Sequence, residues 1–290
     1  MEKFLRINTA AVLVIVMVIV LPKIHSAADR PEVEVHFIDV GQGDSILIET
    51  PTDKSILIDG GPPKAGKTVV SFLKKHGVEK IDLLIATHPD IDHIGGLVEV
   101  LKAVEVEKIL DSGKLHTTKT YASYVSQILK QQIPVEIAHQ NDLIKIDRLL
   151  KIRILNASKG SISNNNSSIA LRVSFKELDF LLMADIGAKR EKILMNKYNL
   201  ESEIFKVAHH GSDTSTTYDL LRRVSPEIAI LTYGRKNDFG HPVERVVKNL
   251  NKAGASIYST AAFGNISIIS DGQDYIILNE KNPTDSLKVG

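Results

Sequence analysis

Metal-binding side chains crowd into one short segment of the sequence. His88, Asp90, Asp92 and His93 follow one another closely, directly after the apolar run 81–87. Imidazole and carboxylate groups are the nitrogen and oxygen donors that bind divalent metal ions. A proline and two glycines predict an irregular loop here, so the four side chains could converge at one strand tip. The first two would share one side of the loop, and the last two would face a second centre; the alternative is a hydrated acidic turn.

Three later segments offer the same kinds of ligand, each at the end of an expected strand. They contain Asp185, the pair His209 and His210, and His241. Taken singly, an aspartate in such a place is commonly a helix cap, and a histidine is commonly structural. Taken together, the four segments supply the number of ligands that a two-metal hydrolase needs, with a carboxylate to bridge the ions.

The spacing of apolar residues predicts the elements that position these segments. The expected strands are 33–38, 45–48, 55–58, 81–87, 109–110, 152–155, 169–175, 180–183, 204–207, 228–231, 266–269 and 275–278, with a further short strand around Ile257. The expected helices are 68–76, one after Gly96, 121–132, 189–196, 217–224 and 243–250. The polar segment 164–168 is expected to be a loop. Strands followed by strand–helix alternation, twice over, predict two facing sheets with helices outside.

The first 28 residues have a different character. Lys3 and Arg6 precede an apolar run at 10–21, and small residues follow at 26–28. This is the pattern of a secretory signal peptide, with cleavage after residue 28. The alternative is an uncleaved N-terminal membrane anchor. In both cases we expect residues 29–290 to be exported, either extracellular or held at the outer face of the membrane.

Composition excludes several classes of protein. With 43% hydrophobic and 24% charged residues, the chain is neither disordered throughout nor collagen-like nor a coiled-coil rod. It contains no cysteine, which excludes a thiol nucleophile, a disulfide scaffold and a thiolate zinc site. The formal net charge is +1 and gives no global attraction to nucleic acid or to an anionic membrane. We expect membrane contact only through the N-terminal segment, and no obligate protein partner.

The order of these motifs resembles that of the metallo-β-lactamase-fold hydrolases, and in particular the hydrolase domain of ComEC-type competence proteins. The matching segments are 37–45, 57–61, 88–96, 166–168, 184–185, 209–212 and 240–242. The resemblance implies an α/β fold, the αββα sandwich of two facing mixed sheets with outer helices, over residues 29–290. Those competence proteins also carry a many-helix channel. No segment after residue 28 is apolar enough for one, so DNA uptake is not carried over.

The same resemblance implies a centre of two divalent metal ions. The implied ligands are His88, Asp90, Asp92, His93, Asp185 and His210, with His209 as the alternative to His210. Asp185 would be the bridging carboxylate. Two departures concern ligands: many members have a histidine where this chain has Asp90, and a further ligand histidine that is absent here. Asn166, Ser167 or water could fill that place. Because oxygen-rich sites suit Mn²⁺ and imidazole-rich sites suit Zn²⁺, we expect Mn²⁺ to serve at least as well as Zn²⁺.

Two ions would lower the pKa of a bridging water toward ~7, and the hydroxide would attack phosphorus or a carbonyl carbon. We expect Asp92 and His241 to be the catalytic residues. His241, expected at a helix N-terminus with Pro242 in the first turn, would bind phosphate or protonate the leaving oxygen. The expected supporting residues, which would orient ligands or contact substrate, are Asp39, Asp44, Asp59, Asn166, Ser167 and Ser212; for Asp44 a simple turn role is the alternative.

The sequence thus predicts an exported metal-dependent hydrolase of phosphodiester bonds, acting on a small molecule or a short nucleic acid. Lysines at 64 and 67 and the basic pair at 235–236 flank the expected site and favour an anionic substrate. One alternative is an amide or ester hydrolase of the β-lactamase or lactonase type, which would want a more apolar, histidine-rich site. Another is a catalytically silent exported binding module, which would have broken ligand motifs.

Overall fold

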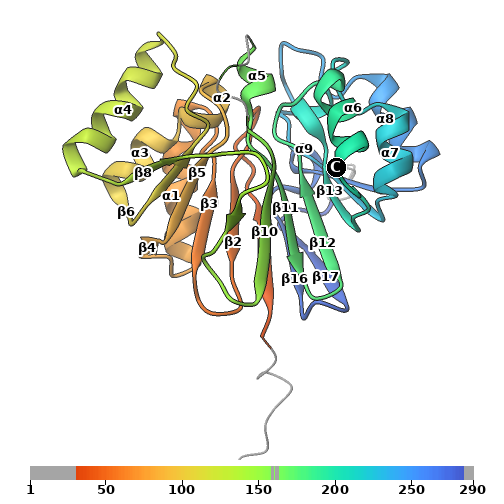
Figure 1. Cartoon of the computed structure of the whole chain (residues 1–290), viewed down its shortest axis with the longest axis horizontal. Coiled ribbons are helices and arrows are strands. Elements are labelled where there is room, and N and C mark those ends of the chain that lie inside the picture. Colours follow the sequence, from red (N-terminus) through yellow and green to blue (C-terminus); the bar gives the residue numbers. More distant parts are fainter. Residues whose placement is uncertain (1–30, 158–159, 161–162, 284–290) are drawn as a thin grey trace, which may run out of the picture. The chain divides into compact units, whose positions relative to one another are not determined.

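The computed structural model describes residues 31–157, 160 and 163–283. The chain divides into two units, 1–30 and 31–290, and the description concerns the second. Two sheets pack face to face in this unit, and helices cover their outer faces (Figure 1). The expected αββα sandwich is confirmed. The predicted signal peptide or anchor lies outside the described residues, among which no helix is long and apolar enough to cross a membrane.

The first sheet has eight strands in the order β17-β16-β1-β2-β3-β5-β7-β8. Their bounds are Val33–Phe37 (β1), Ile46–Glu49 (β2), Ser55–Ile58 (β3), Leu83–Ala86 (β5), Ile109–Asp111 (β7), Val135–Ile137 (β8), Ile266–Ser270 (β16) and Tyr275–Asn279 (β17). The strands from β17 to β3 are antiparallel, and those from β3 to β8 are parallel. Parallel neighbours require crossovers, which the helices between these strands supply.

The second sheet has seven strands in the order β15-β14-β13-β12-β11-β10-β9. Their bounds are Leu143–Ile144 (β9), Leu150–Asn156 (β10), Ala170–Phe175 (β11), Leu178–Leu182 (β12), Ile204–Lys206 (β13), Ile228–Leu231 (β14) and Ser256–Ser259 (β15). Here too an antiparallel set, β9 to β12, continues into a parallel set, β12 to β15. The two short strands Lys80–Ile81 (β4) and Glu105–Val106 (β6) pair separately.

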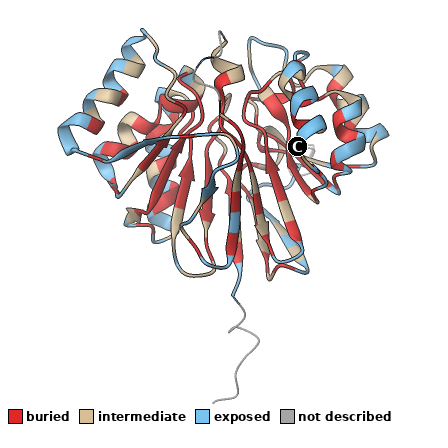
Figure 2. Cartoon of the chain, in the orientation of Figure 1, coloured by how far each residue is buried: buried red, intermediate tan, exposed pale blue. Residues whose placement is uncertain are grey.

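The longer helices lie on the outer faces of the two sheets. The helix bounds are Gly66–Lys75 (α1), Ile91–Ile94 (α2), Leu97–Ala103 (α3), Lys119–Gln131 (α4), Asn164–Ser167 (α5), Ala188–Lys197 (α6), Tyr218–Val224 (α7), Glu244–Lys252 (α8) and Thr260–Phe263 (α9), with 3-10 turns at Pro63–Ala65 (η2) and Ala208–Gly211 (η3). One apolar core fills the space between the sheets and two more lie beneath the helices, so the central strands are buried on both sides, whereas the outer strands β8 and β17 are largely exposed (Figure 2).

Two features differ from the sequence expectation. The polar segment 164–168, expected to be a loop, contains the helical turn α5. The closing strands β16 and β17 do not stay with the second half: β16 pairs antiparallel with β1, so the C-terminal hairpin completes the first sheet. Strands β4, β6, β8 and β9 were not predicted, because each has only two or three residues and little periodicity.

Candidate metal centre

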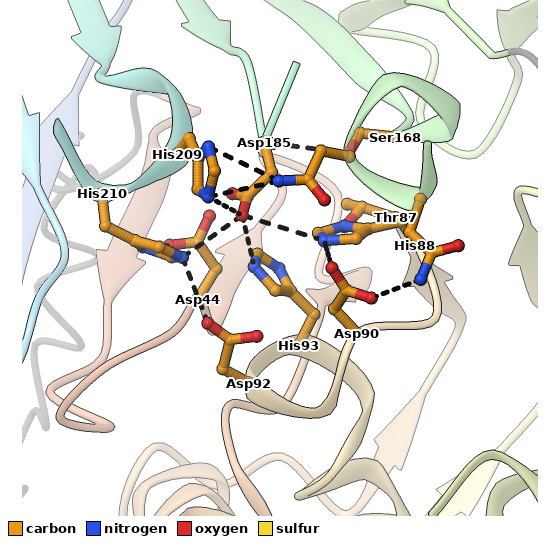
Figure 3. Close-up of polar contacts among 12 residues, drawn as sticks. Asp44, Thr87, His88, Asp90, Asp92, His93, Ser168, Asp185, His209 and His210 are labelled. Carbon is orange, nitrogen blue, oxygen red and sulfur yellow. Dashed lines mark hydrogen bonds and ion pairs between the residues drawn. The ribbon is translucent and has the colours of Figure 1, made fainter. Parts of the chain in front are cut away.

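The candidate ligands gather where parallel strands of both sheets end. The loop after β5 and the helix α2 carry the first four, Asp185 follows β12, and η3 after β13 carries the histidine pair. The carboxyl ends of parallel strands meet at one edge of a sheet, and the sandwich brings the two edges together. Figure 3 shows the side chains pointing toward one another: Asp44, His88, Asp90, Asp92, His93, Asp185, His209 and His210.

Asp185 lies at the middle of this group. Its Oδ2 atom is 3.4 Å from Nε2 of His93 and 3.5 Å from Nε2 of His210. The same oxygen is 3.8 Å from Nε2 of His88 and 3.7 Å from Nε2 of His209. One carboxylate oxygen therefore faces four imidazole nitrogens, which is the position that a carboxylate shared by two ions requires.

Two further carboxylates stand on opposite sides of the imidazoles. Asp90 Oδ2 lies 3.5 Å from His88 Nε2, and Asp92 Oδ2 lies 3.5 Å from His210 Nε2. Ligand atoms of His88, His93 and Asp185 come within 4.8 Å of one another, and so do those of Asp92, His93 and His210. His93 therefore belongs to both groups of ligands, whereas we expected from the sequence that it would face the same centre as Asp92 only.

The donor atoms fit a divalent metal. Within the described residues, buried side-chain atoms without a hydrogen-bond partner include Nε2 of His88, His93 and His210 and Oδ1 of Asp185. An unpaired buried polar group costs about 1–3 kcal/mol, so four of them in one cluster indicate a bound group that satisfies them. Nitrogen and oxygen donors of this kind suit Zn²⁺ or Mn²⁺.

Asp59, after β3, orients the ligands on one side. Its Oδ2 atom lies 2.7 Å from Nδ1 of His93 and accepts a 2.6 Å hydrogen bond from the Thr87 hydroxyl. The Thr87 hydroxyl also lies 3.0 Å from Nδ1 of His88. A proton held on Nδ1 of His93 by this buried carboxylate leaves the Nε2 lone pair for a metal. The expectation for Asp59 agrees with this position.

Asp44 holds the other side. His210 donates from Nδ1 to the Thr232 carbonyl at 2.8 Å, and Asp44 Oδ1 lies 3.4 Å from the same nitrogen. The other oxygen of Asp44 pairs with Lys206 Nζ at 2.9 Å, and both side chains are buried. Asp44 is therefore more than a turn residue. Sequence reasoning missed Lys206, because a single lysine in an apolar strand carries no motif.

The carboxylates and imidazoles of the cluster shift one another's pKa values. Burial alone would raise the pKa of Asp185, but His210 and His93 hold it well below its usual range. Burial alone would lower the pKa of His93, but Asp185 and Asp59 raise it well above its usual value. Asp185 and Asp44 overcome burial in the same way and raise the pKa of His210. Without metal, these two imidazoles bind protons in its place.

Asp39 does not orient a ligand histidine, so this part of its expected role is wrong. Its carboxylate accepts a hydrogen bond from the Gly41 backbone at 3.2 Å and lies 3.3 Å from Lys281 Nζ. Its own backbone N–H donates to the Asn265 side chain at 2.8 Å. The side chain faces the C-terminal segment instead of the histidines, because Asn265 and Lys281 hold Asp39 just before the bend at residues 41–43.

Asn166 and Ser167 do not fill a ligand position, which corrects a second expectation. Ser167 donates to the Asn164 carbonyl at 2.5 Å, and the Asn166 side-chain oxygen accepts from the Gly187 N–H at 3.2 Å. Because α5 is helical, it presents its first two residues to the site instead. Asn164 donates to Asp90 Oδ1 at 2.7 Å, and Asn165 Nδ2 lies 3.2 Å from His209 Nε2.

The two neighbouring histidines differ in their surroundings. His210 is buried and its Nε2 has no hydrogen-bond partner, whereas His209 is 22% exposed. His209 Nδ1 lies 2.9 Å from the Thr214 hydroxyl, which in turn lies 3.0 Å from the Ser212 hydroxyl. This favours His210 as the ligand and leaves His209 at the accessible side. The Ser212 backbone N–H donates to the His209 carbonyl at 2.8 Å, and the Ser212 hydroxyl reaches the His209 ring only through Thr214.

His241 lies beside the cluster, with its ring centroid 5.6 Å from that of His209 and 6.4 Å from that of His210. The expected place of Pro242 in the first turn of a helix is wrong, because α8 begins at Glu244 with Val243 as the N-cap, so His241 lies two residues before the cap. Pro242 therefore precedes the helix, where it packs on the η3 turn. A Cβ atom on Gly211 would come within 2.6 Å of the proline ring, so this close approach requires glycine.

Comparison with known proteins identifies the family. Residues 38–235 match the model of the metallo-beta-lactamase superfamily. The chain belongs to this superfamily. It is 28% identical over 253 residues to ComE operon protein 3 of Bacillus subtilis (strain 168), covering 81% of this chain and 33% of that protein. It is 30% identical over 241 residues to competence protein ComA of Neisseria gonorrhoeae, covering 82% and 32%.

The chain therefore spans about a third of the length of the curated relatives it matches. Among solved structures, the metallo-hydrolase Igni18 of Ignicoccus hospitalis superposes with a TM-score of 0.52 at 16% identity, covering 86% of this chain and 100% of that one. This likeness confirms the metallo-β-lactamase fold. Superfamily membership and the donor set agree that the protein is a metal-dependent hydrolase.

We expect the metal affinity of this candidate centre to fall as the pH decreases. His93 and His210 have raised pKa values, and a protonated imidazole cannot bind a metal. Affinity should change by about tenfold per pH unit for each proton released. Competition with a chelator at roughly pH 6 and pH 9, on either side of the ordinary histidine pKa, measures the change. An affinity that does not vary with pH, after correction for the chelator, would contradict the protonated metal-free state.

Proposed function

We propose that this protein hydrolyses phosphodiester bonds with two divalent metal ions, as a phosphodiesterase or nuclease does. The observation that carries the proposal is the convergence of four imidazole nitrogens on one Asp185 oxygen, with Asp90 and Asp92 on either side. Ions bound there would activate water and neutralise charge on a phosphoryl group. The proposed ligands are His88, Asp90, Asp92, His93, Asp185 and His210.

Neutral hydrogen-bonding groups next to the ligands support an anionic substrate. Asn165, His209 and Thr214 form one hydrogen-bonded group on the accessible side of the cluster. Burial lowers the pKa of His209, so its imidazole is neutral at pH 7. Neutral N–H and O–H donors can bind phosphate oxygens without competing with the metals for the ligand carboxylates.

Two basic residues lie further from the candidate ligands, at the surface. Arg235 and Lys236 are exposed, next to Gly234, whose backbone N–H donates to Gln42 at 3.3 Å. Gln42 in turn lies 3.5 Å from His241, which connects this basic corner to the ligand cluster. Exposed positive charge at such a position attracts an anionic substrate, and its effect weakens with salt.

The test is a panel of chromogenic substrates: a phosphodiester, a phosphomonoester, a carboxylic ester and a β-lactam. The metal-free protein is reloaded with Mn²⁺ or Zn²⁺ before each assay. We expect phosphodiester hydrolysis that a chelator abolishes, with Mn²⁺ at least as effective as Zn²⁺ because three ligands are carboxylates. Hydrolysis of the ester or lactam alone would favour the amide or ester hydrolase. Bound metal with no hydrolysis would favour a silent binding module.

His241→Ala is expected to keep the metals and to lower turnover. Burial and the neighbouring histidines lower the pKa of His241, so phosphate binding by a neutral imidazole is favoured over proton donation. A proton-transfer role would cost ~10²-fold or more in turnover. Metal content, melting temperature and turnover are compared with those of His139→Ala, an exposed histidine elsewhere. Loss of a metal ion would show that His241 is a ligand, and a lower melting temperature with unchanged turnover would show a structural role.

We further propose that the protein acts outside the cytoplasm. The support is the basic, apolar and small-residue order of residues 1–28. Cell fractionation with N-terminal sequencing tests it. A cytoplasmic protein that begins at Met1 would contradict export, and a membrane-bound one would indicate the uncleaved anchor.

A further inference from the structure

A second group of potential ligands lies away from the candidate centre. It consists of His36 in β1, Glu49 at the end of β2 and His76 directly after α1. Glu49 Oε2 lies 2.8 Å from His36 Nε2 and 3.3 Å from His76 Nδ1. Ligand atoms of all three come within 4.8 Å of one another. Two strands and the residue that follows a helix thus contribute one donor each, and the three donors lie close together.

This group lies at the other end of β2 from the candidate metal centre. Asp44 precedes β2 and contacts His210, whereas Glu49 is the last residue of the strand. Five residues of extended chain span roughly 16 Å, at about 3.3 Å per residue. The two groups share no ligand, so one can be changed without the other.

In the described part of the chain, no lysine or arginine forms an ion pair with Glu49 or with its neighbour Glu34. Glu34 in β1 is the direct cross-strand neighbour of Glu49, and like charges in that position repel each other. Glu34 Oε2 also lies 3.5 Å from His36 Nε2. Among the described residues, the ion pairs of both glutamates are with histidines only. Two carboxylates therefore face two imidazoles, and a cation between them would relieve the repulsion.

The geometry and its support also suit a metal. Neighbouring donors in a tetrahedral zinc site lie roughly 3.4 Å apart, as follows from metal–ligand distances of about 2.1 Å. The separations here run from 2.8 to 3.5 Å. His36 Nδ1 is 2.7 Å from the Ser267 hydroxyl, which orients the ring and leaves Nε2 for the metal. The His76 ring stacks on Phe72 at 4.3 Å.

We propose that His36, Glu49 and His76 form a second, structural metal site for a zinc-like divalent ion, with Glu34 or water as the fourth ligand. A cavity of about 360 Å³, lined by Glu49 and His76 among others, gives the ion a route from solvent. The ion would tie the end of α1 to β1 and β2. Mixed imidazole and carboxylate donors favour Zn²⁺ over Mg²⁺ or Ca²⁺.

The experiment counts zinc in the full chain by equilibrium dialysis at micromolar free Zn²⁺. His76→Ala and Glu49→Gln should each bind one equivalent less than the wild type, and His139→Ala should bind the full amount. Zn²⁺ should also raise the melting temperature of the wild type by more than that of either variant. Glu49→Gln keeps the side-chain shape, and melting in chelator shows whether each variant is folded.

The difference between variant and wild type does not depend on how many ions the catalytic cluster holds. Folded variants that bind as much zinc as the wild type would overturn the proposal and leave a hydrogen-bonded histidine–glutamate network. Loss of more than one equivalent would overturn the independence of the two sites. Phosphodiester hydrolysis by the variants should equal that of the wild type when metal is saturating.

Discussion

Asp185→Asn is expected to lose both metal ions and nearly all hydrolysis. One oxygen of this carboxylate faces the Nε2 atoms of four histidines. A neutral amide cannot offset the repulsion between two divalent ions, and its NH₂ group is no ligand at all. Loss of an outer partner of a metal ligand typically costs 10–100-fold, so loss of the central ligand should cost more than ~10²-fold. Metal content after dialysis and turnover on a phosphodiester are the measurements.

Asp179→Asn is the matched control for this variant. Asp179 lies in β12, the strand that leads to Asp185, but pairs with Arg172 away from the ligand cluster. The control should keep metal and turnover. If Asp185→Asn retained the wild-type metal content, Asp185 would not be the shared ligand; it is not a helix cap either, because the N-cap of α6 is Gly187.

Lys206→Met is expected to destabilise the protein by about 3–5 kcal/mol, because it leaves a buried carboxylate without its partner. Lys206 and Asp44 are both buried, and their charged atoms lie 2.9 Å apart. Burial alone would raise the pKa of Asp44, but Lys206 and His210 hold it well below its usual range. The effect should therefore persist at every pH above the ordinary aspartate pKa of about 3.9. Urea unfolding in the presence of chelator measures it.

The double variant Lys206→Met with Asp44→Asn is the control. It removes both charges and should recover much of the lost stability, since replacing a whole buried ion pair is often nearly neutral. A double-mutant cycle gives the coupling between the two residues. A single variant as stable as the wild type would mean that the pair is not a stabilising contact. Metal affinity should also fall in the single variant, because Asp44 helps to orient His210.

The candidate ligands could be predicted from the sequence because the signal is local. His88 to His93 follow a strand whose apolar run is unmistakable, and Asp185 and His210 each follow another. Strand ends of one α/β sheet lie together by rule, which brings Asp185 and His210 together within the second sheet but does not join them to the segment after β5 in the first. The resemblance to a known fold then supplied how the two sheets face each other.

The roles that could not be predicted depended on the direction of a side chain or on contacts between elements far apart in the sequence. Asp39 also follows a strand, but the turn after β1 sends its carboxylate to Lys281. Asn166 was displaced from its expected role by the helical turn α5, which exposes Asn164 and Asn165 to the site. The buried partner Lys206 could not be found either, because its pairing with Asp44 exists only once the two sheets face each other.

The C-terminal hairpin sets the order in which the fold can be completed. β1 is among the first segments of the domain to be synthesised, yet its partner β16 lies far along the chain: His36 and Ser267, which are hydrogen-bonded, are 231 residues apart. At about 5–20 residues per second, the ribosome needs roughly 10–50 s to deliver that partner. Until then one edge of β1 is open, and open edges invite pairing with other chains. The first sheet is therefore complete only after the C-terminal hairpin has been synthesised, and β1 gains its second neighbour late.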